Sequence, residues 1–352
     1  MMPVPLPILD GHNDALLALA RNAERPDSLL ERSSLGHLDL PRAQEGGFAG
    51  GFFAIFTPSG RAMGPRARNT APSYELPFPP TPSLTRAQRF TGALAARLFR
   101  DERASNGQLE VVRDTAALRR CLEQNVLAVI FHIEGAEAID PGLDALEVLY
   151  QAGLRSLGPV WSRPNAFGHG VPFKFPSTPD TGPGLSDAGK ALVRACNELG
   201  VLIDLSHLNE KGFWDIAALS QAPLVATHSN AHALCPISRN LTDDQLRAIR
   251  DSDGMVGVNF ATSMLREDGR PDPQTPLEVM VRHFDHLIER LGEDRVGFGS
   301  DFDGTIVPAA IKDAAGLPHL VEALRAAGYD EPLLRKLGTG NWLRVLALTW
   351  RS

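Results

Sequence analysis

The chain has 352 residues, of which 43% are hydrophobic and 22% are charged, and its formal net charge is −7. This composition is typical of a folded globular protein with room for one large α/β barrel or two ordinary domains. The negative charge and the lack of a basic run argue against nucleic acid as the main partner, and no run reaches the ~18 apolar residues of a membrane span.

Short apolar runs alternate with segments of helical periodicity along the chain. The apolar runs predict strands over 7–12, 46–57, 126–134, 154–161, 201–207, 223–229, 254–260 and 295–301. The periodic segments predict helices over 84–100, 115–124, 143–151, 186–199, 210–219, 242–251, 275–291 and 317–327. Ser186 and Thr242 are suited to capping two of these helices at the N-terminus, and Gly153 and Gly200 to ending two others.

Eight strands in alternation with helices predict a single (β/α)₈ TIM-type barrel over residues 1–352. The strands are nearly continuous hydrophobic runs, as expected when both faces of a parallel sheet are buried. A doubly wound sheet is the structural alternative, but no G-x-G-x-x-G follows the first strand. Two proline-rich stretches, at about 58–83 and 162–184, are expected to be loops over the active face; for the first, a surface excursion is equally compatible.

Targeting and cysteine patterns predict a cytoplasmic protein. The N-terminus lacks the charged and apolar regions of a secretory signal. The three cysteines form no C-x-x-C pair, and their odd number favours a reducing compartment.

The most informative motif is Asp10-Gly11-His12-Asn13-Asp14, at the end of the first predicted strand. Side chains at positions i and i+2 of an extended segment point the same way, so His12 and Asp14 converge on one face. An imidazole beside a carboxylate offers two ligands for a divalent metal ion. The motif alone occurs by chance in many proteins, and its weight comes from the residues spaced downstream of it.

Four further ligand-type residues stand at the ends of later predicted strands: Glu134, His207, His228 and Asp301. A barrel places its catalytic groups at the C-terminal ends of its strands. Burying several ionisable groups there is costly unless a metal compensates, so the set predicts two divalent ions that share one glutamate. Ligation by imidazole and carboxylate without thiolate favours zinc, with manganese or cobalt as lesser options.

The motifs DGHND, IEG, DLSH, THSN, SRN, GSDFDG and GNWLRV occur in this order over essentially the whole chain. Together they resemble the membrane (renal) dipeptidase family, a binuclear zinc branch of the amidohydrolase superfamily. The resemblance implies that one zinc ion is held by one pair of residues, the second by another pair, and both by a bridging glutamate, in the order His12 and Asp14, His207 and His228, and Glu134.

The same resemblance implies roles for three more residues. Asp301 corresponds to the acid/base aspartate that takes a proton from the nucleophilic water and passes it to the leaving amine. Arg239, in the SRN motif, corresponds to the arginine that binds the C-terminal carboxylate of the substrate. Asn341, in the GNWLRV motif, is a further candidate for substrate binding.

One position departs from the family pattern. Where the family usually carries a histidine that contacts the scissile group, this chain has Trp161. His169 lies further along, within a predicted loop, and one hypothesis is that it folds back to take over that contact. Trp161 and His169 are therefore both candidate substrate-binding residues.

The sequence thus predicts a zinc-dependent dipeptidase that acts by a metal-bridging hydroxide, with tolerance for a D-residue at the C-terminal position implied by the resemblance. An N-acyl amino acid amidase or a lactonase on the same scaffold is the alternative enzyme. A catalytically silent metal-binding protein is the third interpretation, suggested by Trp161. A homodimer is expected by analogy only.

Overall fold

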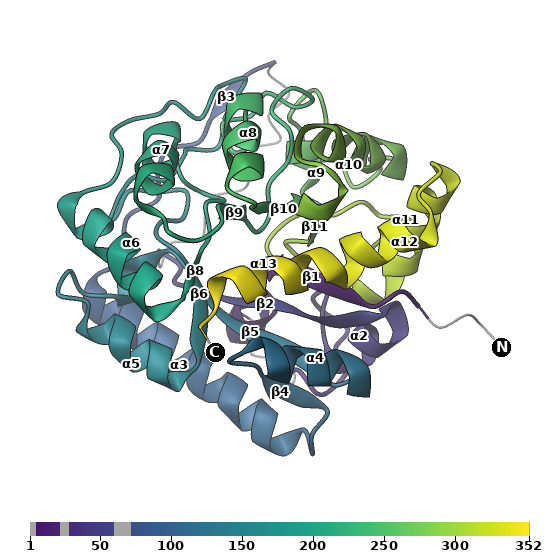
Figure 1. Ribbon diagram of the computed structural model, residues 1–352, viewed down its shortest axis with the longest axis horizontal. Helices are drawn as coiled ribbons and strands as arrows, with labels where there is room; N and C mark the ends of the chain where they lie inside the picture. The colour runs from purple at the N-terminus through teal and green to yellow at the C-terminus, as the bar shows by residue number, and fades with distance from the viewer. Residues whose placement is uncertain (1–4, 22–27, 60–71, 352) are drawn as a thin grey trace.

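The computed structural model describes residues 5–21, 28–59 and 72–351. Eight parallel strands surround a common interior with helices outside, which confirms the (β/α)₈ barrel (Figure 1). The strands are β1 (Ile8–Asn13), β2 (Phe48–Phe56), β5 (Leu127–Glu134), β6 (Leu154–Gly158), β8 (Leu202–Ile203), β9 (Val225–Ala226), β10 (Met255–Asn259) and β11 (Val296–Gly299). They are hydrogen-bonded in the order β8-β6-β5-β2-β1-β11-β10-β9, and a parallel bridge from Asp204 to Val225 joins the two end strands.

The helices begin and end close to the predicted bounds. They are α1 (Ala15–Arg21), α2 (Leu40–Gly46), α3 (Leu84–Ala104), α4 (Thr115–Gln124), α5 (Asp144–Ala152), α6 (Asp187–Leu199), α7 (Glu210–Leu219), α8 (Asp243–Asp251), α9 (Thr262–Leu265), α10 (Leu277–Leu291), α11 (Leu317–Ala326), α12 (Glu331–Arg335) and α13 (Asn341–Thr349). The expected N-caps are confirmed: Ser186 accepts from the amide of Gly189, and Thr242 forms a capping box with Gln245. Within the described ranges, no helix has both the length and the apolar character needed to cross a membrane.

Two strands are much shorter than predicted. The apolar runs at 201–207 and 223–229 contain only β8 and β9, of two residues each. Beyond them, hydrogen bonds from the side chain of Asp204 take over the connection between the two strand ends. A short strand that was not predicted, β4 (Leu109–Val111), pairs with the first half of β5.

The N-terminal end of the barrel is closed by apolar packing. Side chains inside the barrel, among them Leu9, Phe52 and Met255, form one buried cluster with Trp342 of α13. The indole Nε1 of Trp342 donates to the carbonyl of Phe298 at 3.1 Å, and α13 runs across this end of the strands (Figure 1). Polar side chains therefore have only the opposite, C-terminal end available to them.

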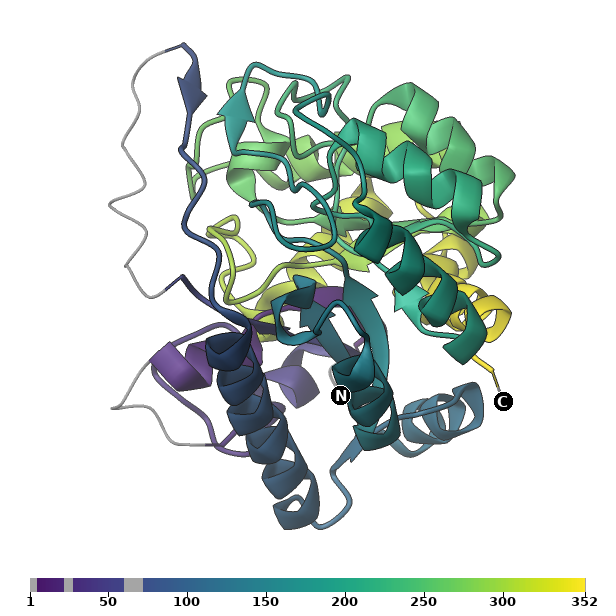
Figure 2. The same ribbon diagram turned by 90° about the vertical axis from the view of Figure 1, so that its left-hand side faces the viewer.

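The two proline-rich loops pair with each other. Strand β3 (Tyr74–Glu75) lies in the first and β7 (Lys174–Phe175) in the second, and they form a two-stranded antiparallel sheet at the upper left of Figure 2. The hydroxyl of Tyr74 also donates to the carbonyl of Gly269 at 2.7 Å. Residues 60–71 of the first loop lie outside the described ranges.

Candidate metal centre

Strand β1 delivers His12 and Asp14 to the C-terminal end of the barrel, as the motif predicts. Both are buried, and the side chain of Asn13 turns away to donate to the carbonyl of Phe52. Neither ring nitrogen of His12 has a hydrogen-bond partner among the described residues. A fully buried imidazole without a partner is costly, and a metal ion is the group that would satisfy it.

Glu134 lies in the middle of three histidines. It ends β5 in register with Phe56 of β2 and Gly158 of β6. Its Oε1 is 2.9 Å from Nε2 of His207, 3.5 Å from Nε2 of His228 and 3.6 Å from Nε2 of His12. One carboxylate is thus within reach of ions held by different histidines, which is the geometry needed for a bridging ligand.

The other ring nitrogen of two of these histidines is held by a hydroxyl group. Nδ1 of His207 is 2.9 Å from Oγ of Ser162, and Nδ1 of His228 is 2.8 Å from Oγ1 of Thr227. Metal-binding histidines are commonly oriented by a hydrogen bond to the nitrogen that does not bind the metal. Both side chains therefore present Nε2 toward Glu134.

Asp301 joins the centre from the end of β11. One ligand atom from each of His12, Asp14 and Asp301 lies within 4.8 Å of the others, and the same holds for Glu134, His207 and His228. Asp301 has a positive φ of 57°, an uncommon conformation for a residue other than glycine, and strained backbone of this kind clusters at functional sites. Its Oδ2 accepts from Nδ2 of Asn259 at 3.1 Å.

Gly304 makes room for the two aspartates. A Cβ atom at this position would lie 2.2 Å from Oδ1 of Asp301 and 2.4 Å from Oδ2 of Asp14. Any side chain here would therefore displace both carboxylates. The two acidic groups face a space that only a glycine leaves open.

The electrostatics of the bare side chains favour a cation. Burial, followed by the negative charges of Asp14 and Asp301, raises the pKa of Glu134 well above its usual range. Burial also lowers the pKa values of His12, His207 and His228 well below 6.5, which keeps the imidazoles neutral and able to bind a metal. Neutral imidazoles around crowded carboxylates fit a divalent metal ion.

Arg239 lies beside this centre. It is buried, donates from Nη1 to Oγ of Ser229 at 2.9 Å and from Nη2 to the carbonyl of His228 at 3.1 Å. Burial lowers its pKa to about 10, so the guanidinium stays charged at neutral pH. A fixed positive charge next to the ligands suits the predicted binding of a substrate carboxylate.

Trp161 lines the same region, whereas His169 does not approach it. The ring of Trp161 lies 5.8 Å from that of His207 and 4.7 Å from that of Phe56, measured between centroids. The described contacts of His169 lie within its loop: its carbonyl accepts from the amide of Asn209, and its Nδ1 lies 3.8 Å from where a Cβ of Gly182 would be.

Asn341 lies at the other end of the barrel. Its Nδ2 donates to the carbonyls of Glu293 and Val296, both at 2.7 Å, where β11 begins. The side chain ties the start of α13 to the start of a strand. This position corrects the expectation that Asn341 binds substrate, because the ligand-type residues gather where the strands end.

Sequence reasoning missed several residues that support the centre. Asp204 accepts four hydrogen bonds between β8 and β9, and Asn259 donates to Asp301. Asp204 lies in the DLSH motif and Asn259 ends a predicted strand, so strand-end position was the available signal. Hydroxyl partners such as Ser162 carry no such signal, because their role depends on contacts distant in sequence.

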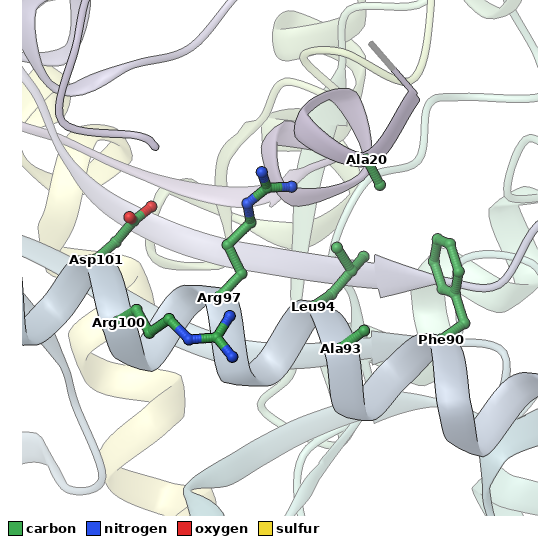
Figure 3. Close-up of a pocket in the computed structure, with 7 residues that line it drawn as sticks. All are labelled: Ala20, Phe90, Ala93, Leu94, Arg97, Arg100 and Asp101. Carbon is green, nitrogen blue, oxygen red and sulfur yellow. The ribbon is translucent and has the colours of Figure 1, made fainter. Parts of the chain in front are cut away.

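A separate pocket of about 460 Å³ lies between α1 and α3 (Figure 3). Arg97, Arg100 and Asp101 line it together with small and apolar side chains. None of the predicted site residues contributes to it.

Comparisons with known proteins agree with this geometry. The family model described as Membrane dipeptidase (Peptidase family M19) matches residues 2–349. The crystal structure of a metallopeptidase from Rhodobacter sphaeroides, liganded with a phosphinate mimic of the dipeptide L-Ala-D-Ala, is 56% identical and has a TM-score of 0.96; the match covers 98% of this chain and 100% of that one.

Two curated relatives are also similar in sequence. A protein in the pqqA 5′ region of Klebsiella pneumoniae is 55% identical over 248 residues, which are 70% of this chain and 92% of the relative. A protein in the PQQ-III 3′ region of Acinetobacter calcoaceticus is 41% identical over 295 residues, 83% of this chain and 92% of the relative. With a family model that spans nearly the whole sequence, this chain belongs to the membrane dipeptidase family, peptidase family M19, and is a metallopeptidase that hydrolyses peptide bonds.

Proposed function

We propose that this enzyme is a zinc-dependent dipeptidase that holds two Zn²⁺ ions and cleaves the single amide bond of dipeptides, including those with a D-residue at the C-terminal position. The observation that carries the proposal is the position of Glu134 among Nε2 atoms of three histidines. The dipeptide mimic bound to the 56% identical Rhodobacter sphaeroides enzyme supports the substrate class and the D-residue.

We assign one ion to His12 and Asp14, the other to His207 and His228, and both to Glu134. The donors are imidazole nitrogens and carboxylate oxygens, which suit zinc. Two such ions supply an activated water at neutral pH and polarise the scissile carbonyl.

In this proposal Asp301 moves the proton. Its Oδ2 is held by Nδ2 of Asn259, and the residue sits in the same group as His12 and Asp14. A carboxylate at this place can accept a proton from the attacking water and donate it to the departing amine. The strained backbone fixes the carboxylate in position before the substrate binds.

Arg239 sets the length of the substrate. Its guanidinium is fixed by Ser229 and by the backbone of His228, a proposed metal ligand. The distance from the scissile carbonyl to the charged group is therefore fixed as well. A free carboxylate one residue beyond the scissile bond would meet this arginine, which is the spacing of a dipeptide.

The test is hydrolysis of a small panel by purified, zinc-loaded protein, with metal quantitation on the same sample. The panel contains L-Ala-L-Ala, L-Ala-D-Ala, tri-alanine, N-acetyl-alanine and a simple lactone. We expect two zinc ions per chain, cleavage of both dipeptides and poor cleavage of the other compounds. Faster turnover of N-acetyl-alanine or of the lactone would favour the alternative amidohydrolase reactions, and a metal-loaded protein inert toward the whole panel would favour the silent protein.

A further inference from the structure

Asp204 anchors the gap in the barrel between β8 and β9. The carboxylate is buried, and its Oδ1 accepts from the amide of Ser206 at 3.0 Å, from Oγ of Ser206 at 2.6 Å and from the amide of Thr227 at 2.9 Å. Its Oδ2 accepts from Oγ1 of Thr227 at 2.6 Å. Two backbone amides donate to Oδ1, so this oxygen can only be an acceptor.

Two hydroxyl groups connect this carboxylate to His228. Oγ of Ser206 accepts from the backbone amide of His228 at 3.0 Å, and Oγ1 of Thr227 lies 2.8 Å from its Nδ1. His228 is therefore held both at its backbone and at its ring. Both connections end on Asp204, one on each carboxylate oxygen.

The direction of the ring connection is set by the chemistry of the groups. An ionised carboxylate only accepts hydrogen bonds, so the hydroxyl of Thr227 gives its proton to Asp204. The lone pair left on that hydroxyl must then accept from Nδ1 of His228. Nδ1 carries the proton, and the lone pair of Nε2 is free toward Glu134, 3.5 Å away.

We propose that Asp204 is a positioning residue that sets the tautomer of His228 through Thr227, so that Nε2 is available to a metal ion. The proposal rests on the proposed function, in which His228 is a metal ligand. Asp204 also lies near His12 and His228 in a group able to hold a cation. Its four hydrogen bonds already occupy both oxygens, which favours positioning over direct ligation.

The Asp204→Asn substitution tests the direction of the chain of hydrogen bonds. The two backbone amides that donate to Oδ1 exclude an NH₂ group there, so the new NH₂ must face Thr227. The hydroxyl would then accept from the amide and donate to Nδ1 of His228, which moves the imidazole proton to Nε2 and blocks the metal. A reversed hydrogen bond of this kind is known to hold a catalytic histidine in the wrong tautomer.

The first measurement uses the metal-free parent protein and its ¹⁵N histidine spectrum. We expect the Nδ1–H tautomer for His228 in the parent and the Nε2–H tautomer in the Asp204→Asn variant. An Nε2–H tautomer in the parent overturns the proposal without any variant having to fold.

The second measurement is the Zn²⁺ affinity of each protein, by competition with a chromophoric chelator. Loss of an outer hydrogen-bond partner commonly costs about 10–100-fold in metal affinity, and we expect this loss for Asp204→Asn and for Thr227→Val. Thr227→Ser keeps the hydroxyl and should retain the parent affinity. The double variant with both Asp204→Asn and Thr227→Val should bind Zn²⁺ more tightly than Asp204→Asn alone, because the misdirected hydroxyl is gone.

The matched control is Thr91→Val, on α3. Thr91 is equally buried, and its Oγ1 has no hydrogen-bond partner among the described residues, so this variant measures the general effect of the substitution. Parent-like affinity in Thr227→Val overturns the proposal and leaves the proposed function standing. A parent that binds no Zn²⁺ overturns both, so the two failures can be told apart.

Discussion

Oε1 of Glu134 lies 2.9 Å from Nε2 of His207, although the two residues come from different strands and are far apart in the sequence. Two groups that both bind metals approach each other this closely because neither carries the charge expected in water. Burial raises the pKa of the carboxyl and lowers that of the imidazole. The contact therefore marks the place where a cation replaces the proton.

The first prediction is that Glu134→Gln loses zinc from both sites. The amide oxygen is a weaker ligand than a carboxylate and carries no charge to offset two cations. The protein should retain clearly fewer than two zinc ions per chain after dialysis, and dipeptide hydrolysis should be lost. Glu137→Gln is the control, because Glu137 is also buried but bonds to Arg163 instead. Full zinc content with normal turnover in Glu134→Gln would contradict the bridging assignment.

The second prediction concerns the pH dependence of the metal-free protein. The pKa of Glu134 is raised on folding, so the folded state binds more protons than the unfolded state above the usual carboxyl pKa. Its contribution to the free energy of unfolding is present at low pH and is lost as the pH rises through the folded pKa. The lowered histidine pKa values act in the opposite sense, but only below about pH 6.5.

Comparing two metal-free proteins separates these contributions. Glu134→Gln has the same histidines and lacks the titrating carboxyl, so the melting temperature of this variant relative to the parent should rise steadily from about pH 5 to about pH 8. Thermal unfolding followed by circular dichroism measures the difference. A difference that stays constant across this range would show that Glu134 does not titrate as described.

The third prediction is that Arg239→Met removes the preference for a free C-terminal carboxylate. A hydrogen bond to a charged group is worth roughly 1.5–3 kcal/mol, so kcat/KM for dipeptides should fall about tenfold to a hundredfold. Dipeptide amides, which lack the carboxylate, should already be poor substrates of the parent and should change little. If the parent cleaves dipeptide amides as fast as the free acids, Arg239 does not bind the carboxylate.

The fourth prediction is that Asp301→Asn lowers kcat while zinc stays bound. Asparagine tolerates the positive φ of 57°, and its oxygen can still accept from Asn259, so the local structure should be kept. Loss of proton transfer should cost about 10²–10⁴-fold. Asp303→Asn has the same kind of backbone at φ 69° two residues later, and it should behave like the parent. Equal losses in the two variants would point to a disturbed loop instead.

The barrel and the ligand-type residues could be predicted because both arise from local patterns. Buried parallel strands read as apolar runs, and a barrel brings the residues after those runs to one end. The short strands β8 and β9 could not be predicted, since Asp204 replaces backbone pairing there with side-chain hydrogen bonds. The wrong expectation for Asn341 has a related cause: a motif shows that a residue matters, but only the contact with Val296 shows what it does.

The last prediction addresses the position where this chain departs from the family pattern. If His169 folded back over the metals, its loop would have to leave the bonds that now hold it. The carbonyl of His169 accepts from Asn209, and the amide of the next residue but one, Val171, donates to the carbonyl of His207. These bonds fix the backbone on both sides of the ring.

We therefore expect His169→Ala to retain the kcat and the zinc content of the parent. Loss of an oxyanion donor would instead lower kcat by about 10²–10³-fold, so the two outcomes are well separated. Steady-state kinetics with L-Ala-D-Ala, with Asn209→Ala as a variant that frees the loop without touching the ring, checks this. A large kcat loss in His169→Ala at full zinc content would show that the loop moves when substrate binds and that His169 takes the place that Trp161 leaves without a proton acceptor.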